Sequence, residues 1–277
     1  MLRLIYYPTA IILAVIVLTS SLDELRLIRI ASAQQNFEHV TEIAWKSIWE
    51  KLSFSLYSGA SKAKSDIEDL YVEASKHARV ADRCALAFFI LSISFLALRS
   101  WLARGRGGHL NLSVTADLLG VSMICLAVGL SAPIFSLKAY TALPMLGEVV
   151  LKFEAKSVLT TVLSLLQSGS LFIAILVATF SIITPMIKIL VAIIVVQHRW
   201  PVLHRPAVEF IKAIGKWSMA DVFVVAIFVA YFAASGDEFS DANLGIGLYF
   251  FTTYCLLSLI ATQNLASSLY AQNGLNQ

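Results

Sequence analysis

The chain has 277 residues, of which 58% are apolar and 14% are charged, and its formal net charge is +3. An ordinary soluble domain is about 45 to 50% apolar, so this composition indicates a polytopic membrane protein. The small net charge, with basic residues spread among the loops, argues against nucleic acid as a partner. Cys84, Cys125 and Cys255 lie far apart in apolar runs, which gives no support for a disulfide framework or a zinc site.

Apolar segments set the predicted architecture, because a helix that crosses a membrane needs about 20 mostly apolar residues. By this rule the sequence predicts an all-α polytopic membrane protein with six spans. In chain order they cover residues 4–19, 84–101, 115–137, 171–196, 219–234 and 244–265. The first and the fifth are short.

The first span, 4–19, has a second interpretation as a cleaved signal peptide. Ala31, Ser32 and Ala33 form the A-x-A pattern of a cleavage site. The apolar run ends about a dozen residues before that pattern, which is too early for cleavage there. We therefore expect an uncleaved membrane anchor.

Residues 20–83, between the first two spans, form the one sizeable soluble segment that the sequence predicts. Apolar residues recur at helical spacing on both sides of a break at Ser58 and Gly59. They are Phe37, Val40, Ile43, Ala44, Ile48 and Leu52 before the break, and Ile67, Leu70, Tyr71, Ala74 and Ala78 after it. The pattern predicts an external helical hairpin whose apolar stripes pack on each other. A docking surface for a partner or for lipid is the alternative.

Loop charges predict the orientation, because short loops rich in Lys and Arg stay in the cytoplasm. Such residues follow the second span (Arg99, Arg104 and Arg106) and the fourth (Arg199, Arg205, Lys212 and Lys216). On the other side we expect a mixed-charge turn within 138–156 and an acidic turn within 237–241. Both termini are then predicted to be cytoplasmic.

The fourth span contains a polar stripe in an otherwise apolar helix. Ser181, Thr184 and Lys188 are spaced to share one face of an α-helix. A lysine in a membrane costs about 2.5 to 3.5 kcal/mol and usually faces other helices or water. Pro185 lacks a backbone donor, which frees the carbonyl of Ser181 and predicts a helix kink. Lys188 snorkelling to the membrane surface is the alternative.

The fifth and sixth spans add further polar residues. Ser218 and Asp221 have the spacing of a capping box, and a helix dipole favours a carboxylate in the first turn. Alternatively, Asp221 lies deep enough to form an ion pair with Lys188. Ser258 is predicted near the same depth, so three helices would converge on one polar site. Bonding of the Ser258 hydroxyl to its own helix backbone is the competing interpretation.

Motifs of enzymes are absent from the sequence. It contains no GxSxG, P-loop, HExxH or GxGxxG pattern. His198 and His204 share a loop, but their spacing fits no metal site and they are better interpreted as solvated residues. We therefore expect no enzymatic activity, no metal and no cofactor.

Three stretches of the sequence resemble the paraquat-inducible protein A family, whose members are inner-membrane proteins of Gram-negative bacteria. They lie at 132–190, 215–230 and 247–262, and the most specific element is W-S-M-x-D-V-F. The family pattern falls on Pro133, Pro185, Lys188, Trp217, Ser218, Met219, Asp221, Val222, Phe223 and Ser258. The resemblance covers roughly residues 113–270, a module of four helices.

This resemblance implies a transporter-like or loading subunit for lipids moving between the inner and outer membranes, with an MCE-domain protein as partner. It also implies that the polar intramembrane residues couple proton or lipid movement to a conformational change. The chain has one module where longer relatives have two, and it lacks their cysteine-rich zinc ribbons. The expected domains are 1–110, with the hairpin, and 111–277, the family-like module. A non-transporting scaffold, a sensor that uses the hairpin, and a homo-oligomer remain open.

Overall fold

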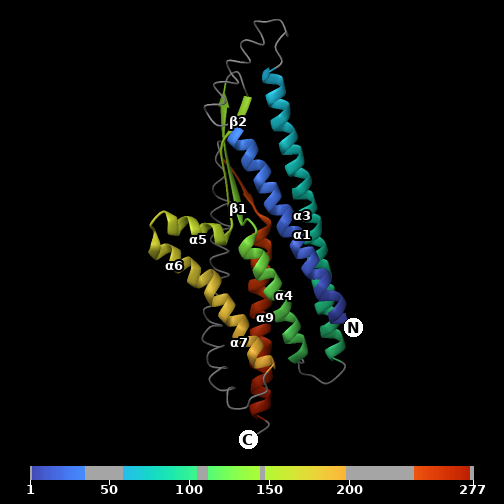
Figure 1. Cartoon of the computed structure of the whole chain (residues 1–277). Coiled ribbons are helices and arrows are strands. Elements are labelled where there is room, and N and C mark those ends of the chain that lie inside the picture. Colours follow the sequence, from blue (N-terminus) through green and yellow to red (C-terminus); the bar gives the residue numbers. More distant parts are fainter. Residues whose placement is uncertain (1, 35–58, 105–111, 144–146, 198–239, 275–277) are drawn as a thin grey trace.

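The computed structural model describes residues 2–34, 59–104, 112–143, 147–197 and 240–274 (Figure 1). Most of these residues are helical. The elements in chain order are α1 (Leu2–Gln34), α3 (Gly59–Arg104), α4 (Leu112–Ser131), β1 (Phe135–Leu143), β2 (Gly147–Lys156), α5 (Val158–Gln167), α6 (Leu171–Ala178), the π-helical turn η1 (Thr179–Ile183), α7 (Thr184–Gln197), β3 (Ser240–Leu244) and α9 (Ile246–Gly274).

Five helical segments in the described part of the chain are long and apolar enough to cross a membrane. They are Leu2–Ser32, Glu68–Ala103, Ser113–Ser131, Leu171–Ile194 and Ile246–Leu265. The predicted class, an all-α polytopic membrane protein, is confirmed. The predicted span at 219–234 lies outside the described residues, so the count of six stays a prediction.

α1 and α3 form a long antiparallel pair (Figure 1). Their buried residues recur in steps of three and four, which is the spacing of a coiled-coil seam. On α1 these residues include Ala10, Ala14, Val17, Ser21, Ile28 and Ala31, and on α3 they include Ala74, Ala81, Ala85, Phe88, Ser92 and Phe95. Because many of them are small, the two helices pack closely along the seam.

The structure differs from the predicted hairpin because α3 is a single continuous helix. The sequence treated the stripe at 67–78 and the span at 84–101 as separate elements, but one helix runs from Gly59 to Arg104. No Gly or Pro interrupts it after Gly59, and the seam continues through the predicted boundary. α1 likewise continues to Gln34, well beyond the predicted end at residue 19. The other arm of the hairpin, 37–52, lies outside the described residues.

α4 and α9 pack against each other at close range. A Cβ atom added to Gly129 would lie 2.7 Å from the backbone nitrogen of Phe251 and 2.9 Å from its Cα. A larger residue at this position would therefore push the helices apart. The core beside this contact contains the fully buried rings of Phe88, Phe250 and Tyr254.

A three-stranded antiparallel sheet in the order β2-β1-β3 was not predicted. β1 pairs with both neighbours, so Phe135 lies opposite Lys156 on one side and Leu244 on the other. The third span was predicted to reach residue 137, but α4 ends at Ser131. Pro133 explains the earlier end, because proline cannot continue the helical hydrogen bonding. Lys138, Lys152, Glu154 and Asp241, predicted to be parts of charged turns, instead lie in strands; Asp237 and Glu238 lie outside the described residues.

The predicted fourth span, 171–196, is helical but irregular. α5 precedes it and is connected to α6 through Gly169, whose φ is +78°, a left-handed conformation that glycine adopts at little cost. α6, η1 and α7 then follow one another without a gap. The π turn lies directly before the residues of the predicted polar stripe on α7.

Candidate functional site: two polar centres and an apolar groove

Lys188, on α7, lies in the interior of the protein. Its relative exposure is 4%, and it has an interaction partner within the protein. The neighbouring residues Met186 and Ile187 are exposed by 53% and 42%. The lysine is thus on the inner face of a helix whose other face is apolar and exposed, which favours the interior interpretation over snorkelling.

The helix leading to Lys188 changes its hydrogen bonding at η1. The backbone N–H of Thr184 donates to the carbonyl of Thr179, five residues earlier, and Pro185 has no N–H to donate. The predicted common face of Ser181, Thr184 and Lys188 assumed an unbroken α-helix. The π turn alters the rotation between the first and the last of these residues. Ser181 and Thr184 are accordingly half-buried, whereas Lys188 is buried.

Ser258, on α9, is the second predicted site residue that the structure buries. It is 1% exposed, and its Oγ has no hydrogen-bond partner among the described residues. A helical serine usually donates to the carbonyl three or four residues earlier. The competing interpretation, a bond of this kind from the Ser258 hydroxyl, is not formed among the described residues.

Lys188 and Ser258 lie at the same level of two neighbouring helices. Ala192 and Ala261 belong to one buried cluster between α4, α7 and α9. Lys188 precedes Ala192 by one turn, and Ser258 precedes Ala261 by about one turn. α7 and α9 run in the same direction (Figure 1), so both buried polar residues lie within about one turn of this shared cluster. Ser218 and Asp221 lie outside the described residues, so the ion pair and the capping box stay predictions.

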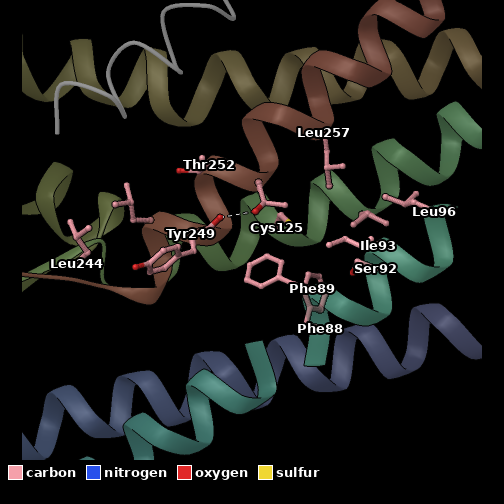
Figure 2. A pocket seen from close by; sticks show the side chains of 13 residues that line it. Phe88, Phe89, Ser92, Ile93, Leu96, Cys125, Leu244, Tyr249, Thr252 and Leu257 are labelled. Atoms are coloured by element: carbon pink, nitrogen blue, oxygen red, sulfur yellow. Dashed lines mark hydrogen bonds between the residues drawn. The ribbon is translucent and has the colours of Figure 1, made fainter. Parts of the chain in front are cut away.

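An apolar groove of about 600 Å³ lies between α3, α4 and α9 (Figure 2). Phe88 and Val121 are fully buried at its inner wall, whereas Ile93 and Tyr249 are 67% and 55% exposed. The groove is thus open towards the side that a membrane would cover. Its other lining residues are Phe89, Ser92, Leu96, Cys125, Leu244, Leu248, Thr252, Thr253 and Leu257.

Two of the four hydroxyl groups in this lining are directed to partners within the protein. Thr253 Oγ1 donates to the carbonyl of Tyr249 at 2.8 Å, and the Ser92 hydroxyl pairs with that of Tyr6 at 2.8 Å. The surface left for a ligand is therefore largely hydrocarbon. Leu257 lines the groove and the next residue, Ser258, belongs to the buried polar centre. α9 consequently separates an apolar environment from a polar one.

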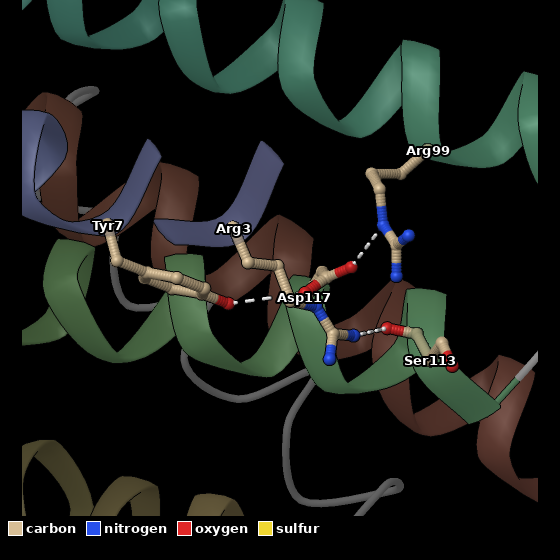
Figure 3. A network of polar contacts seen from close by, with 5 residues as sticks. All are labelled: Arg3, Tyr7, Arg99, Ser113 and Asp117. Atoms are coloured by element: carbon tan, nitrogen blue, oxygen red, sulfur yellow. Dashed lines mark hydrogen bonds and ion pairs between the residues drawn. The ribbon is translucent and has the colours of Figure 1, made fainter. Parts of the chain in front are cut away.

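A second polar centre surrounds Asp117 on α4, and the sequence interpretation missed it (Figure 3). Asp117 is 1% exposed; its Oδ1 lies 2.7 Å from Arg3 Nε and its Oδ2 2.7 Å from Arg99 Nε. Tyr7 Oη donates to Oδ1 at 3.4 Å, and Arg3 Nη2 donates to the Ser113 carbonyl at 2.8 Å. The cluster joins α1, α3 and α4.

The centre around Asp117 has a simple signal in the sequence. Asp117 is a charge within an apolar stretch, as are Lys188 and Asp221, and the same reasoning applies to it. Arg99 was interpreted as part of a cytoplasmic loop, but it lies inside α3 and pairs with Asp117. Its contact with a carboxylate eighteen residues later depends on how α3 and α4 pack, which no local pattern gives.

A family model matches the second half of the molecule. Residues 122–272 match the family model of paraquat-inducible protein A. A protein of Haemophilus influenzae described as a probable intermembrane transport protein is 27% identical over 122 residues, which is 41% of this chain. The chain spans 28% of the length of that relative.

The matched region contains one polar centre but not the other. It includes Lys188, Ser258 and the α9 wall of the groove, whereas Arg3, Arg99 and Asp117 precede it. The family model covers 151 of the 277 residues, from 122 to 272. The chain therefore belongs to the paraquat-inducible protein A family.

Proposed function

We propose that this chain is a transporter-like or loading subunit for lipids that move across a bacterial envelope. The observation that carries the proposal is the pairing of the apolar groove with the buried polar centre on the other side of α9. A phospholipid has an apolar tail and a polar head group. The groove suits the first, and Lys188 with the Ser258 hydroxyl suits the second.

The free-energy cost of burying these polar groups supports the proposal that a ligand binds at this centre. Leaving a buried hydroxyl without a hydrogen bond costs about 1 to 3 kcal/mol. Ser258 carries such a group, and a head-group oxygen or a transported water would relieve the cost. Lys188 adds a cation that is expensive to keep inside a membrane, which supports a functional rather than a packing role.

The cellular setting belongs to the same proposal. The Haemophilus relative is described as a probable intermembrane transport protein, which supports a role in transport, and the family resemblance adds an inner-membrane location and a partner such as an MCE-domain protein. We propose that both termini are cytoplasmic and that the sheet faces the partner. A membrane-impermeant thiol reagent should label Ser58→Cys and miss Gly107→Cys in a background without Cys84, Cys125 and Cys255. The reverse labelling would overturn this topology.

Lipid entry into the groove can be tested by photocrosslinking in intact membranes. Cys125 lines the groove and is 0% exposed, while its neighbour Leu126 is 1% exposed and does not line it. A diazirine amino acid at position 125 should give adducts with the mass of a phospholipid, and the same residue at 126 should give few. Equal yields at both positions would count against lipid in the groove.

Transport can be distinguished from a non-transporting scaffold by removing one charge. Asp221→Asn keeps the shape and the capping ability of the side chain but not its charge. We expect this variant to reach wild-type abundance and to fail to support envelope integrity under detergent stress. Asp23→Asn, on a partly exposed side chain of α1, serves as the control. Full resistance of Asp221→Asn at equal abundance would favour the scaffold.

A further inference from the structure

The cluster around Asp117 has an excess of positive charge. Two guanidinium groups share one carboxylate, which leaves a net charge of +1 at the site. The carboxylate is inaccessible, with 1% of its side chain exposed, whereas Arg99 and Arg3 are exposed by 24% and 46%. The positive groups are thus the part of the cluster that a ligand can reach.

Hydrogen-bond donors remain at this site. A guanidinium group has five N–H donors. Arg99 uses Nε for Asp117, and within the described residues its two terminal nitrogens donate to no protein acceptor. Figure 3 shows these nitrogens beside the carboxylate of Asp117, whose other oxygen faces the guanidinium of Arg3. Arg3 uses Nε and one terminal nitrogen. An anion with several oxygens fits this set of donors.

The surroundings of the cluster are those of a lipid head group. α1 begins, α3 ends and α4 begins at the same end of the helix bundle (Figure 1). Large apolar side chains next to the arginines are exposed: Leu4 by 79%, Trp101 by 70% and Leu102 by 51%. Tryptophan is enriched where a membrane meets water. Basic pockets between membrane helices commonly hold anionic head groups.

We propose that Arg3 and Arg99 bind the phosphate of an anionic phospholipid, while Asp117 holds the two guanidinium groups in position. The acyl chains of this lipid lie against the exposed apolar surface near Leu4 and Trp101. The site is on α1, α3 and the first turns of α4, and it does not depend on the proposed transport through the groove. Free phosphate shares the same chemistry, so the test must separate the two sources.

The test is thermal unfolding of the purified full-length chain in a non-ionic detergent, titrated with dioleoyl phosphatidylglycerol. A ligand of the folded state raises the unfolding midpoint with concentration, which gives an apparent affinity. We expect Arg3→Gln and Arg99→Gln each to weaken this affinity about fivefold, the effect of one basic residue near an anionic head group. Each variant leaves Asp117 with one arginine. Arg29→Gln, an exposed arginine near the other end of α1, should leave the affinity unchanged.

A variant with the opposite expected effect distinguishes binding from simple support of the fold. Asp117→Asn raises the charge of the site from +1 to +2, so it should lower the midpoint without lipid yet tighten the apparent affinity for phosphatidylglycerol. Unchanged affinity in both arginine variants would overturn the proposal. If phosphatidylcholine stabilises the protein as much as phosphatidylglycerol does, the assignment to an anionic head group is overturned. If inorganic phosphate alone gives the full stabilisation, the assignment to a lipid is overturned.

Discussion

The two polar centres of this protein differ in how far their hydrogen bonds are completed. At Asp117, both carboxylate oxygens meet an arginine nitrogen at 2.7 Å, and the partners come from three helices. At the α7–α9 centre, the Ser258 hydroxyl is buried without a hydrogen-bond partner among the described residues, close to a π turn. The first arrangement pairs its buried carboxylate fully, so that only the more exposed arginines remain for a ligand, whereas the second leaves the buried group itself for a ligand.

This difference follows the boundary of the family match. The centre whose buried carboxylate is paired lies before residue 122, and the centre whose buried hydroxyl has no partner among the described residues lies within the matched residues 122–272. A buried polar group that lacks a partner is costly, so its presence in the part shared with relatives is best explained by function. The comparison can be tested by changing one residue from each centre.

The largest loss of stability is expected from Asp117→Leu. Removing one partner of a fully buried ion pair costs about 3 to 5 kcal/mol, and we expect a smaller loss here because Arg99 and Arg3 are 24% and 46% exposed. Two arginines would lose their carboxylate here. Asp23→Asn is the control, because its 3.7 Å pair with Arg26 is exposed and such pairs contribute about 0 to 1 kcal/mol. Unfolding of the purified variants would measure the difference, and similar losses would show that Asp117 does not hold the helices together.

A double-mutant cycle tests whether Lys188 and Asp221 share a site. Lys188→Met and Asp221→Leu should each destabilise the protein, and the double variant should cost less than the sum. For residues in contact, the interaction energy is about 0.5 to 3 kcal/mol. The free energy of unfolding of the four proteins provides the measurement. Additive effects would mean that the buried lysine has its partner elsewhere.

No loss of stability is expected from Ser258→Ala, because the hydroxyl that it removes makes no hydrogen bond within the described structure. The variant should be at least as stable as the wild type, since an unbonded buried hydroxyl costs about 1 to 3 kcal/mol, but it should yield fewer lipid adducts in the crosslinking assay. Ser122→Ala is the matched control: Ser122 is also buried, and its Oγ donates to the Leu119 carbonyl at 2.8 Å. That control should lose about 1 kcal/mol and keep the adducts. If Ser258→Ala is destabilised equally, its hydroxyl has a structural role.

Membrane helices were predictable because their signal is local. Runs of apolar residues predicted the five segments that, in the described part of the chain, are helical, long and apolar enough to cross a membrane. Boundaries were less predictable, since α3 continues from Gly59 through the expected external segment on a seam of small residues such as Ala74 and Ala81. Small residues score weakly as apolar, although they pack two helices closely.

The sheet and the Asp117 cluster depend on contacts between distant residues. The alternation of Lys152, Phe153 and Glu154 is a strand signal, but its charges suggested a turn. β3 pairs with β1 across about a hundred residues, and Arg3 lies 114 positions before Asp117. Lys188 and Ser258 could be chosen from sequence because each is a polar residue in a single apolar run. The apolar groove needs three helices and has no signal in any one of them.

The ladder between β1 and β3 constrains how the molecule can move. β1 follows α4 and β3 precedes α9, and five residue pairs join the two strands. Gly245 and Gly247 add backbone bonds to the carbonyls of Ile134 and Pro133 at 2.8 and 2.9 Å. Sliding α9 along α4 would break all of these bonds together, so the two helices behave as one rigid body. Among the described helices, α6 and α7 are not joined to α9 by such a ladder, so their displacement would change the position of Lys188 relative to Ser258 while the α4–α9 wall of the groove keeps its shape.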